Sequence, residues 1–387
     1  MLVALALPVA IAQPVGQAKT AAEAQNRFGL ELLARVALER RHENVFVSPS
    51  SIFLALTMAE TGAEGRTRAA MRRTLEVPAG VSEDAMHESA AALLKALRSH
   101  ADGIELSIAN ALWSDRSMPL AAAFVQRCQN LYEADAITLD FQNPEAAAVI
   151  NDWVKQRTRQ KISEIVSPEV VARSKAILTN AVYFHGRWRD PFPKEATQNG
   201  IFHLVSGTQK TVPFMRQPAL HGAYRSGDGF EAVMLPYGRS GMALFAILPA
   251  PGKSPEEAVA KVSIQNLIHG NEPFDLELLL PRFTLDFSAS LKQPLEQMGM
   301  GIAFRFPGAE FAPMGSPLFY IGDVLHKTRL EVDEEGTVAA ATTAVVVRSM
   351  AMRRVEKKTL AFDRPFALLL CDTSTGAILF AGLVYEP

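Results

Sequence analysis

The sequence predicts an α+β fold in which helices dominate the N-terminal half and strands the C-terminal half. Apolar residues recur at helical spacing up to about residue 159, whereas continuous apolar runs rich in β-forming residues follow residue 175. Strands and helices do not alternate strictly, which argues against a doubly wound sheet. No repeat, low-complexity tract or polar linker divides the 387 residues, so we expect one continuous domain.

Helices are expected in five places before residue 160. Residues 21–39 place apolar side chains on one helical face. A second helix opens at Ser48-Pro49-Ser50 and continues through Met58, because proline suits the first turn of a helix. Residues 145–159 should bury Ile150, Trp153 and Val154. The apolar face of the first helix comprises Phe28, Leu32, Leu33, Val36 and Ala37, and further helices are expected at residues 85–98 and 121–132.

Strands are expected after residue 175, where the helical spacing of apolar residues gives way to continuous apolar runs. Residues 176–184 form a nearly continuous apolar run, typical of a buried central strand. The last two strands flank residues 372–376, a glycine-containing hairpin loop. The shorter strands are expected at residues 231–235, 243–248, 275–280, 366–370 and 377–384.

Composition and motifs argue against several classes of function. The formal net charge is −2, so no basic field favours nucleic acid. The chain lacks the signatures of hydrolases, zinc proteases and phosphate-binding loops, and neither a catalytic residue, a metal site nor a cofactor is expected. Cys371 ends an apolar run, which favours a buried free thiol, although a disulfide with Cys128 stays open. The acidic residues near 331–335 are expected to form a solvated turn.

The first twelve residues are expected to be an export signal or a loose N-terminal tail. Leu2–Ala12 is an apolar run of eleven residues, too short to span a bilayer. It ends in Ala10-Ile11-Ala12, a small-residue pattern typical of signal-peptide cleavage, although no positive charge precedes Lys19. We therefore expect a secreted or extracellular protein, with the bacterial periplasm as an alternative, and no membrane association.

One segment is unusual. An acidic turn leads through Gly336 into small and β-branched residues that continue to Val347. In an extended chain one face carries no charge for eleven residues, so such a strand is suited to the middle of a sheet. Residues 348–354 then read as exposed and cleavable. An ordinary buried strand that ends in a loop is the alternative interpretation. The uncharged face comprises Thr337, Ala339, Ala341, Thr343, Val345 and Val347.

This segment resembles the reactive-loop hinge of the serpin family, and other motifs resemble the same family in the same order. Together they cover about residues 21–387. The hinge-like segment is Glu331–Thr342, and the other motifs are Asn44–Ile52, Ile150–Val154 with Thr158 and Lys161–Ile162, Leu178–Trp188, Phe362–Phe366 and Gly376–Gly382.

The resemblance implies a serpin fold with three β-sheets, eight or nine helices and an exposed reactive loop at about residues 334–355. It also implies an inhibitor, not an enzyme. A serine protease attacks the loop and forms an acyl-enzyme, and the cleaved loop inserts into the central sheet. The hinge implied is Glu334, Glu335, Gly336, Thr337, Ala339, Ala340, Ala341, Thr342 and Thr343; the shutter beneath the strands that part is Ser48, Ser51, Asn180 and His326; and Trp188 lies at the breach, where insertion begins.

Two positions depart from the family pattern, and two alternative functions stay open. Gln160 stands where the family often has glycine, and Val338 replaces a frequent glutamate on the outward face. Non-inhibitory serpins often carry bulky or charged hinge residues, whereas this hinge is small, which favours inhibition over a non-inhibitory binding protein. Inhibition of cysteine proteases also stays open. The protein is expected to act as a monomer.

The cleaved bond is expected between Met350 and Ala351. In the family it usually lies sixteen positions after the hinge glutamate that matches Glu334. Methionine is unbranched and apolar, which suits the pockets of elastase-, chymotrypsin- or subtilisin-like enzymes. A register shift of two residues would place Arg348 there instead and invite trypsin-like enzymes.

Overall fold

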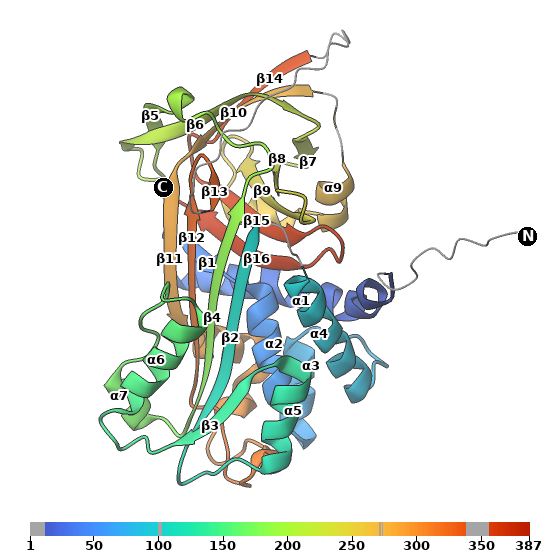
Figure 1. The fold of residues 1–387 in the computed structure, drawn as a ribbon, viewed down its shortest axis with the longest axis vertical. Coiled ribbons are helices and arrows are strands. Elements are labelled where there is room, and N and C mark those ends of the chain that lie inside the picture. Colours follow the sequence, from blue (N-terminus) through green and yellow to red (C-terminus); the bar gives the residue numbers. More distant parts are fainter. Residues whose placement is uncertain (1–11, 100–102, 271, 273, 338–355) are drawn as a thin grey trace, which may run out of the picture.

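Three β-sheets and the helices that cover them make up the computed structural model (Figure 1). It describes residues 12–99, 103–270, 272, 274–337 and 356–387. The described part contains nine α-helices of at least six residues and a four-residue helical turn. The predicted α+β class, the three sheets and the approximate number of helices are confirmed.

The central sheet has the strand order β11-β12-β4-β2-β3, and a short strand β13 also pairs with β4. Strands β12 and β4 run parallel in register from Asp323↔Ile177 to Arg329↔Tyr183. The β12–β4 pairing stops before the end of β4, and that end positions the candidate site. The bounds are β11 (Phe283–Ser290), β12 (Asp323–Val332), β4 (Ala176–Arg187), β2 (Ile104–Asp115), β3 (Asp135–Leu139) and β13 (Gly336–Thr337).

The other two sheets pack behind and above the central sheet (Figure 1). The second sheet, in the order β1-β16-β15-β9-β8-β7, comprises β1 (Val45–Val47), β16 (Ile378–Val384), β15 (Phe366–Asp372), β9 (Met242–Pro249), β8 (Phe230–Tyr237) and β7 (Tyr224–Gly227). The third, in the order β14-β10-β6-β5, comprises β14 (Glu356–Ala361), β10 (Phe274–Pro281), β6 (Gln209–His221) and β5 (Gln198–His203).

Most helices lie in the N-terminal half, as predicted. Ser48 caps the second helix and accepts a hydrogen bond from the Ser51 N–H, with Pro49 in the first turn. The helices are α1 (Ala12–Glu39), α2 (Pro49–Glu60), α3 (Gly65–Thr74), α4 (Glu83–Arg98), α5 (Ala122–Tyr132), α6 (Ala146–Arg157), α7 (Pro168–Arg173), α8 (Pro255–Ala260), α9 (Ile264–His269) and α10 (Lys292–Leu295), with short 3₁₀ or π segments at Lys194–Ala196, Glu296–Met300, Gly301–Phe304 and Ala312–Met314.

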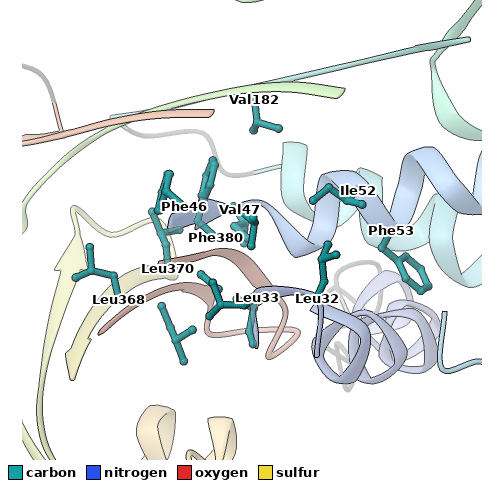
Figure 2. Close-up of a cluster of buried hydrophobic side chains, with 14 of the residues drawn as sticks. Leu32, Leu33, Phe46, Val47, Ile52, Phe53, Val182, Leu368, Leu370 and Phe380 are labelled. Atoms are coloured by element: carbon teal, nitrogen blue, oxygen red, sulfur yellow. The ribbon is translucent and has the colours of Figure 1, made fainter. Parts of the chain in front are cut away.

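Strand β4 separates two hydrophobic cores. Its residues Val182 and Phe184 belong to the main core, which α1, α2 and the second sheet share. Figure 2 shows Val182 pointing toward Phe46 and Val47. Residues Ile177 and Ala181 point the other way, into a smaller core beneath α6 and α7. Because successive strand residues alternate in this way, a strand placed beside β4 between Ile177 and Tyr183 would be buried on both faces.

One local expectation is wrong, and two elements were missed. Helix α3 was not predicted, because its sequence is rich in arginine and only four of its ten residues are buried. Strand β2 was not predicted either; its first residues are half-buried and the polar Asn110 interrupts its apolar pattern. Trp153 is only half-buried, since its Nε1 donates to Asp135 Oδ2 at 2.9 Å at the rim of α6.

Both cysteines are free and buried, as favoured for Cys371. Burial raises the pKa of the Cys128 thiol to about 12. Residues 1–11 lie outside the described part, so the expected export signal is not tested there. Among the described residues no helix is both long and apolar enough to cross a membrane.

The chain after α6 turns through two left-handed residues, Arg159 (φ +51°) and Gln160 (φ +66°). The Gln160 N–H closes the helix end by donating to the Lys155 carbonyl at 2.8 Å. Left-handed backbone favours glycine because a Cβ crowds the next carbonyl. Gln160 therefore adopts a backbone conformation that glycine adopts more easily, which is a physical reason for the glycine that the family often has here.

Replacing Gln160→Gly should raise the free energy of unfolding by about 0.5–1 kcal/mol, because the relief of left-handed strain exceeds the added backbone entropy. Equilibrium denaturation in urea measures the change. The matched control is Ser163→Gly. Ser163 is exposed and nearby but does not have left-handed backbone, so glycine there should lower stability. Equal losses in both variants would contradict the strain at Gln160.

Candidate functional site

The expected hinge enters the central sheet at its open end. Residues Gly336 and Thr337 pair antiparallel with β4, in the register Gly336↔Arg187 and Thr337↔Gly186. The β12–β4 pairing ends below this point, at Arg329↔Tyr183. Strand β13 therefore occupies the position beside β4 that β12 leaves at this end of the sheet.

Only glycine fits at position 336. Its φ is +147°, and a Cβ built there would lie 2.2 Å from the Gly186 carbonyl oxygen and 2.7 Å from Arg187 Cα. Both atoms belong to the backbone, so no rotation of a side chain relieves the clash. The lone glycine in the acidic turn thus allows the close approach of the hinge to β4.

Three hydrogen bonds fix the acidic turn Asp333–Glu335, where the hinge begins, to the chain that follows β4. The Trp188 N–H donates to the Glu335 carbonyl at 3.0 Å, and the Phe192 N–H donates to the Glu334 carbonyl at 2.8 Å. The Trp188 indole Nε1 donates to the Asp333 carbonyl at 2.9 Å. The indole is buried and stacks on Tyr237 with ring centroids 4.5 Å apart. Trp188, which the resemblance expects at the breach, thus lies where the chain enters β13.

The acidic turn is not a solvated one, which corrects that expectation for Glu334. This side chain is buried, accepts a hydrogen bond from Thr197 Oγ1 at 2.7 Å and lies 3.8 Å from Arg282 Nη1. Glu335 forms an ion pair with Lys194. These contacts line a cavity of about 510 Å³ beside the hinge. A run of acidic residues reads as solvated in the sequence because its basic partners come from distant segments.

The four residues expected at the shutter lie together beneath β4 and β12. His326 Nδ1 is 2.5 Å from Asn180 Oδ1, and the Ser48 N–H donates to His326 Nε2 at 3.1 Å. Asn180 Nδ2 donates to Ser51 Oγ. Since β12 carries His326 and β4 carries Asn180, their bond links the two parallel strands from side chain to side chain.

Asn110 of β2 is a fifth member that was not predicted. Asn180 Nδ2 also donates to Asn110 Oδ1 at 2.5 Å, and Asn110 Nδ2 donates to the Ser51 carbonyl at 3.3 Å. Asn110 stands directly opposite Asn180 in the β2–β4 register. The only available signal was a lone asparagine inside an apolar stretch. We call Ser48, Ser51, Asn110, Asn180 and His326 the central polar cluster.

Burial keeps His326 neutral. The ring is fully buried, and burial lowers its pKa to about 3. Because Asn180 uses its amide hydrogens elsewhere, its Oδ1 accepts from His326 Nδ1–H, and Nε2 is left to accept from Ser48. A second proton on Nε2 would face the Ser48 N–H, so the cluster has no place for it.

The remaining expected site residues lie outside the described part of the chain. They include Met350 and Ala351, the alternative Arg348, and hinge positions after Thr337. Within the described ranges, no group of three or more His, Cys, Asp or Glu side chains is placed to hold a metal ion. The hinge positions concerned are Ala339, Ala340, Ala341, Thr342 and Thr343.

Known proteins share both the sequence and the fold. The family model described as Serpin (serine protease inhibitor) matches residues 23–387. A serpin-like protein of Thermococcus kodakarensis is 36% identical over 378 residues, covering 96% of this chain and 87% of the relative. The leukocyte elastase inhibitor of Homo sapiens is 30% identical over 378 residues, covering 94% and 98%. The crystal structure of native tengpin, a thermophilic serpin, matches with a TM-score of 0.83 at 28% identity, covering 96% of this chain and 94% of that chain.

The three-sheet fold and the match over nearly the whole chain define a class of protein. The chain belongs to the serpin family, which is described as serine protease inhibitors. The resemblance inferred from its motifs is confirmed.

The buried His326 should make stability fall in acid. Its folded pKa of about 3 lies below the ordinary 6.5, so its contribution is complete above pH 6.5 and is lost as the pH falls toward 3. Between pH 7 and pH 5, wild type should lose about 2 kcal/mol more than His326→Gln, measured by denaturant unfolding. The control His269→Asn changes an exposed histidine and should keep the wild-type slope. Parallel profiles for wild type and His326→Gln would show that His326 takes up a proton in the fold.

Proposed function

We propose that this protein is an irreversible, suicide-type inhibitor of serine proteases. A protease cleaves the loop after residue 337, forms an acyl-enzyme and is trapped when the loop inserts beside β4. The observation that carries the proposal is the pairing of β13 with β4, because it sets the register of a longer strand. The family membership supports the same reading.

Continuing that register assigns every inserted residue a face. Residues directly opposite in an antiparallel pair share a face. Ala339 would stand opposite Phe184, Ala341 opposite Val182 and Thr343 opposite Asn180, all on the face of the main core. Those loop residues are small, whereas their partners on β4 are large apart from Asn180. The uncharged face of the loop thus falls on the buried side of the sheet.

The same register ends where the uncharged face ends. Strand β4 begins at Ala176, and continued pairing places Val347 opposite it. Arg348, the first charged residue of the segment, falls just beyond the strand. A twelve-residue strand spans about 40 Å. The loop is therefore long enough to follow β4 from one end to the other.

Insertion of this length requires a cut in the loop while β14 stays in place. Strand β14 begins at Glu356 and lies in the third sheet, at the same end of the molecule as β13 (Figure 1). Nine residues from Val347 span at most about 30 Å, less than the about 40 Å back along β4. Cleavage removes this constraint, which couples the protease reaction to insertion.

Insertion must also break the central polar cluster. Thr343 would enter between Asn180 and His326, which now share a hydrogen bond at 2.5 Å. The seven residue pairs between β12 and β4 would separate, and the new strand would pair with both. Each net ladder bond contributes about 0.5–1.5 kcal/mol, so pairing on two sides exceeds what the opening removes.

The residue at the expected cleavage site, Met350, predicts the protease class. Incubation with an elastase-, chymotrypsin- or subtilisin-like protease should give a complex that survives SDS, and mass spectrometry of the released peptide should place the cut at Met350–Ala351. Met350→Leu should keep the complex, because leucine suits the same pockets. A cut after Arg348 and inhibition of trypsin-like enzymes would shift the assigned bond. Cleavage by every protease tested without any covalent complex would contradict the inhibitor proposal and favour a non-inhibitory binding protein.

Thr337→Arg should turn the inhibitor into a substrate. The register puts this position opposite Gly186, on the inward face, where a guanidinium would be buried without an assigned partner at a cost of several kcal/mol. Thr337 already pairs with β4, so an arginine there should displace β13 from the sheet, and insertion must then bury the guanidinium again; this delay lets deacylation release the protease. The measurement is the ratio of covalent complex to cleaved protein with the same protease.

The matched control is Val338→Arg. Its position continues opposite His185, which is only half-buried on the outward face, so the added charge need not enter the core. This variant should keep the wild-type ratio of complex to cleaved protein. Full retention of complex by Thr337→Arg would mean that the assigned register is wrong.

We also propose that the protein acts outside the cytoplasm, which rests on the apolar run Leu2–Ala12. Helix α1 begins at Ala12, and Ala18 is its first buried residue among those whose burial is described. Removal of residues 1–12 would therefore leave the described core of α1 in place.

A further inference from the structure

Strand β14, which follows the loop, is an edge strand of the third sheet. In the described part it pairs with β10 on one side only, in parallel register from Phe274↔Glu356 to Leu279↔Ala361 (Figure 1). Among its side chains whose burial is described, Leu360 alone is buried, while Lys357 and Thr359 are exposed. A strand with one neighbour and one buried side chain is weakly held by its own sheet.

Lys358 ties this edge strand to a different sheet. Its Nζ donates to the Tyr224 hydroxyl of β7 at 2.6 Å and forms an ion pair with Glu231 of β8, and both strands belong to the second sheet. The Tyr224 hydroxyl donates in turn to Glu231 Oε1 at 2.6 Å. The ammonium also lies 5.6 Å from the ring centroid of Phe274 in β10. We call Lys358, Tyr224 and Glu231 the β14 clamp.

The β14 clamp is partly shielded from solvent. The Lys358 and Glu231 side chains are 33% and 38% exposed, and Tyr224 is buried. The hydrogen bond to Glu231 raises the pKa of Lys358 to about 12, so the ammonium persists at neutral pH. Hydrogen bonds to a charged group contribute more than neutral ones, whereas the solvent near the ion pair weakens it. Loss of the ammonium should therefore make detachment of β14 about tenfold more frequent.

Release of β14 would remove the need for a cut in the loop. With β14 in place, the chain from Val347 to Glu356 reaches about 30 Å at most, less than the about 40 Å along β4. If the six residues of β14 left β10, the free chain would run from Val347 to Phe362 and reach about 50 Å. Phe362 is buried, and its N–H donates to the Leu279 carbonyl at 2.9 Å, so the chain beyond β14 can stay in place. Strand β14 is therefore the segment that decides whether an uncut loop can insert.

We propose that Lys358 is a positioning residue that fixes β14 against the second sheet and thereby makes insertion of the loop depend on cleavage. The inference rests on the proposed function in treating insertion beside β4 as the functional motion. Without the β14 clamp, β14 detaches more often, and the uncut loop inserts and can no longer trap a protease. The β14 clamp thus sets the lifetime of the active inhibitor.

Lys358→Met tests the β14 clamp, because methionine keeps an apolar stem and removes the ammonium. Tyr224 can still donate to Glu231, so the rest of the contact is preserved. Hydrogen exchange of the intact protein, without protease, should become about tenfold faster at the β14 amides than in wild type. Lys358→Arg keeps a charged donor and should retain slow exchange. Unchanged exchange of β14 in Lys358→Met would overturn the proposal.

Incubation of the uncut protein measures the consequence for the loop. Each variant is kept at one temperature without a target protease, and samples are treated briefly with proteinase K. Mass spectrometry then gives the fraction that is still cut between residues 338 and 355, because a strand inserted in the sheet is shielded from cleavage. This fraction should decline about tenfold faster in Lys358→Met than in wild type. An equal decline despite faster exchange of β14 would mean that β14 does not limit insertion, which would also overturn the proposal.

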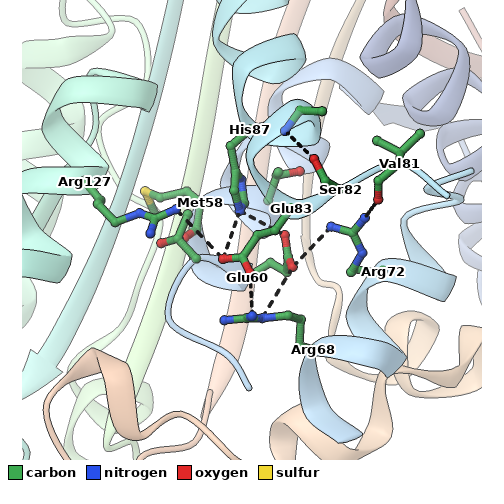
Figure 3. Close-up of polar contacts among 12 residues, drawn as sticks. Met58, Glu60, Arg68, Arg72, Val81, Ser82, Glu83, His87 and Arg127 are labelled. Carbon is green, nitrogen blue, oxygen red and sulfur yellow. Dashed lines mark hydrogen bonds and ion pairs between the residues drawn. The ribbon is translucent and has the colours of Figure 1, made fainter. Parts of the chain in front are cut away.

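Two controls separate the β14 clamp from charge and from general stability. Lys357→Met changes the neighbouring lysine, which is exposed on the other face of β14 and has no ion pair in the described part, and it should match wild type in both measurements. Glu83→Gln removes an ion pair with Arg68 at 2.5 Å, beside the buried Glu60 and between helices α3 and α4 (Figure 3). Equal acceleration in Glu83→Gln and Lys358→Met would assign the effect to stability and overturn the proposal.

The two measurements also distinguish this proposal from the proposed function. Neither of them uses covalent inhibition as a readout. Absence of any SDS-stable complex, with faster exchange and faster loss of cleavage in Lys358→Met, would contradict the inhibitor proposal and leave the β14 clamp supported. A stable complex with unchanged exchange in Lys358→Met would support inhibition and overturn the β14 clamp.

Discussion

The hydrogen bond between His326 and Asn180 joins β12 to β4, the two strands that would separate in the proposed insertion. It links β12 to β4 at 2.5 Å, and the other three members of the central polar cluster are arranged around it. A buried polar group is expensive to leave unsatisfied, so the cluster resists any separation of the two strands that offers no new partner. A strand that brings its own backbone groups and a hydroxyl offers such partners. In the proposed mechanism, the same interaction therefore keeps the sheet closed until an inserted strand replaces it.

At the open end of the sheet, the structure already places the start of the loop beside β4. There β12 has already left β4, Gly336 fits against the β4 backbone where a Cβ would clash, and Trp188 and Phe192 hold the preceding turn by hydrogen bonds to its carbonyls. The turn is held through the backbone and by buried Glu334, so the loop starts in a fixed register. In the proposed insertion, the small residues Ala339 and Ala341 would continue this register opposite Phe184 and Val182 of β4.

Sequence reasoning succeeded where a pattern was local. Apolar periodicity found α1 and α2, and the apolar run found β4, because these elements bury one face or both faces. The four residues expected at the shutter lie together in one hydrogen-bonded cluster, while their role in opening stays a proposal. Sequence reasoning failed where the local pattern of apolar residues was weak. Helix α3 has few buried residues, and β2 carries Asn110 at a point where a strand pattern should be apolar. Glu334 read as solvated because Thr197 and Arg282 are far away in the chain.

The sequence by itself determined the fold class, the main helices and strands, the family and an uncharged face in the segment after Gly336, since each depends on residue type and short-range spacing. Only the tertiary structure decided the rest. It set the register of β13 against β4, added Asn110 to the central polar cluster and surrounded Glu60 with Arg68, Arg72 and His87. Pairing partners, burial of a carboxyl group and the pKa that results depend on which distant segments meet, and a one-dimensional pattern carries no record of those distances.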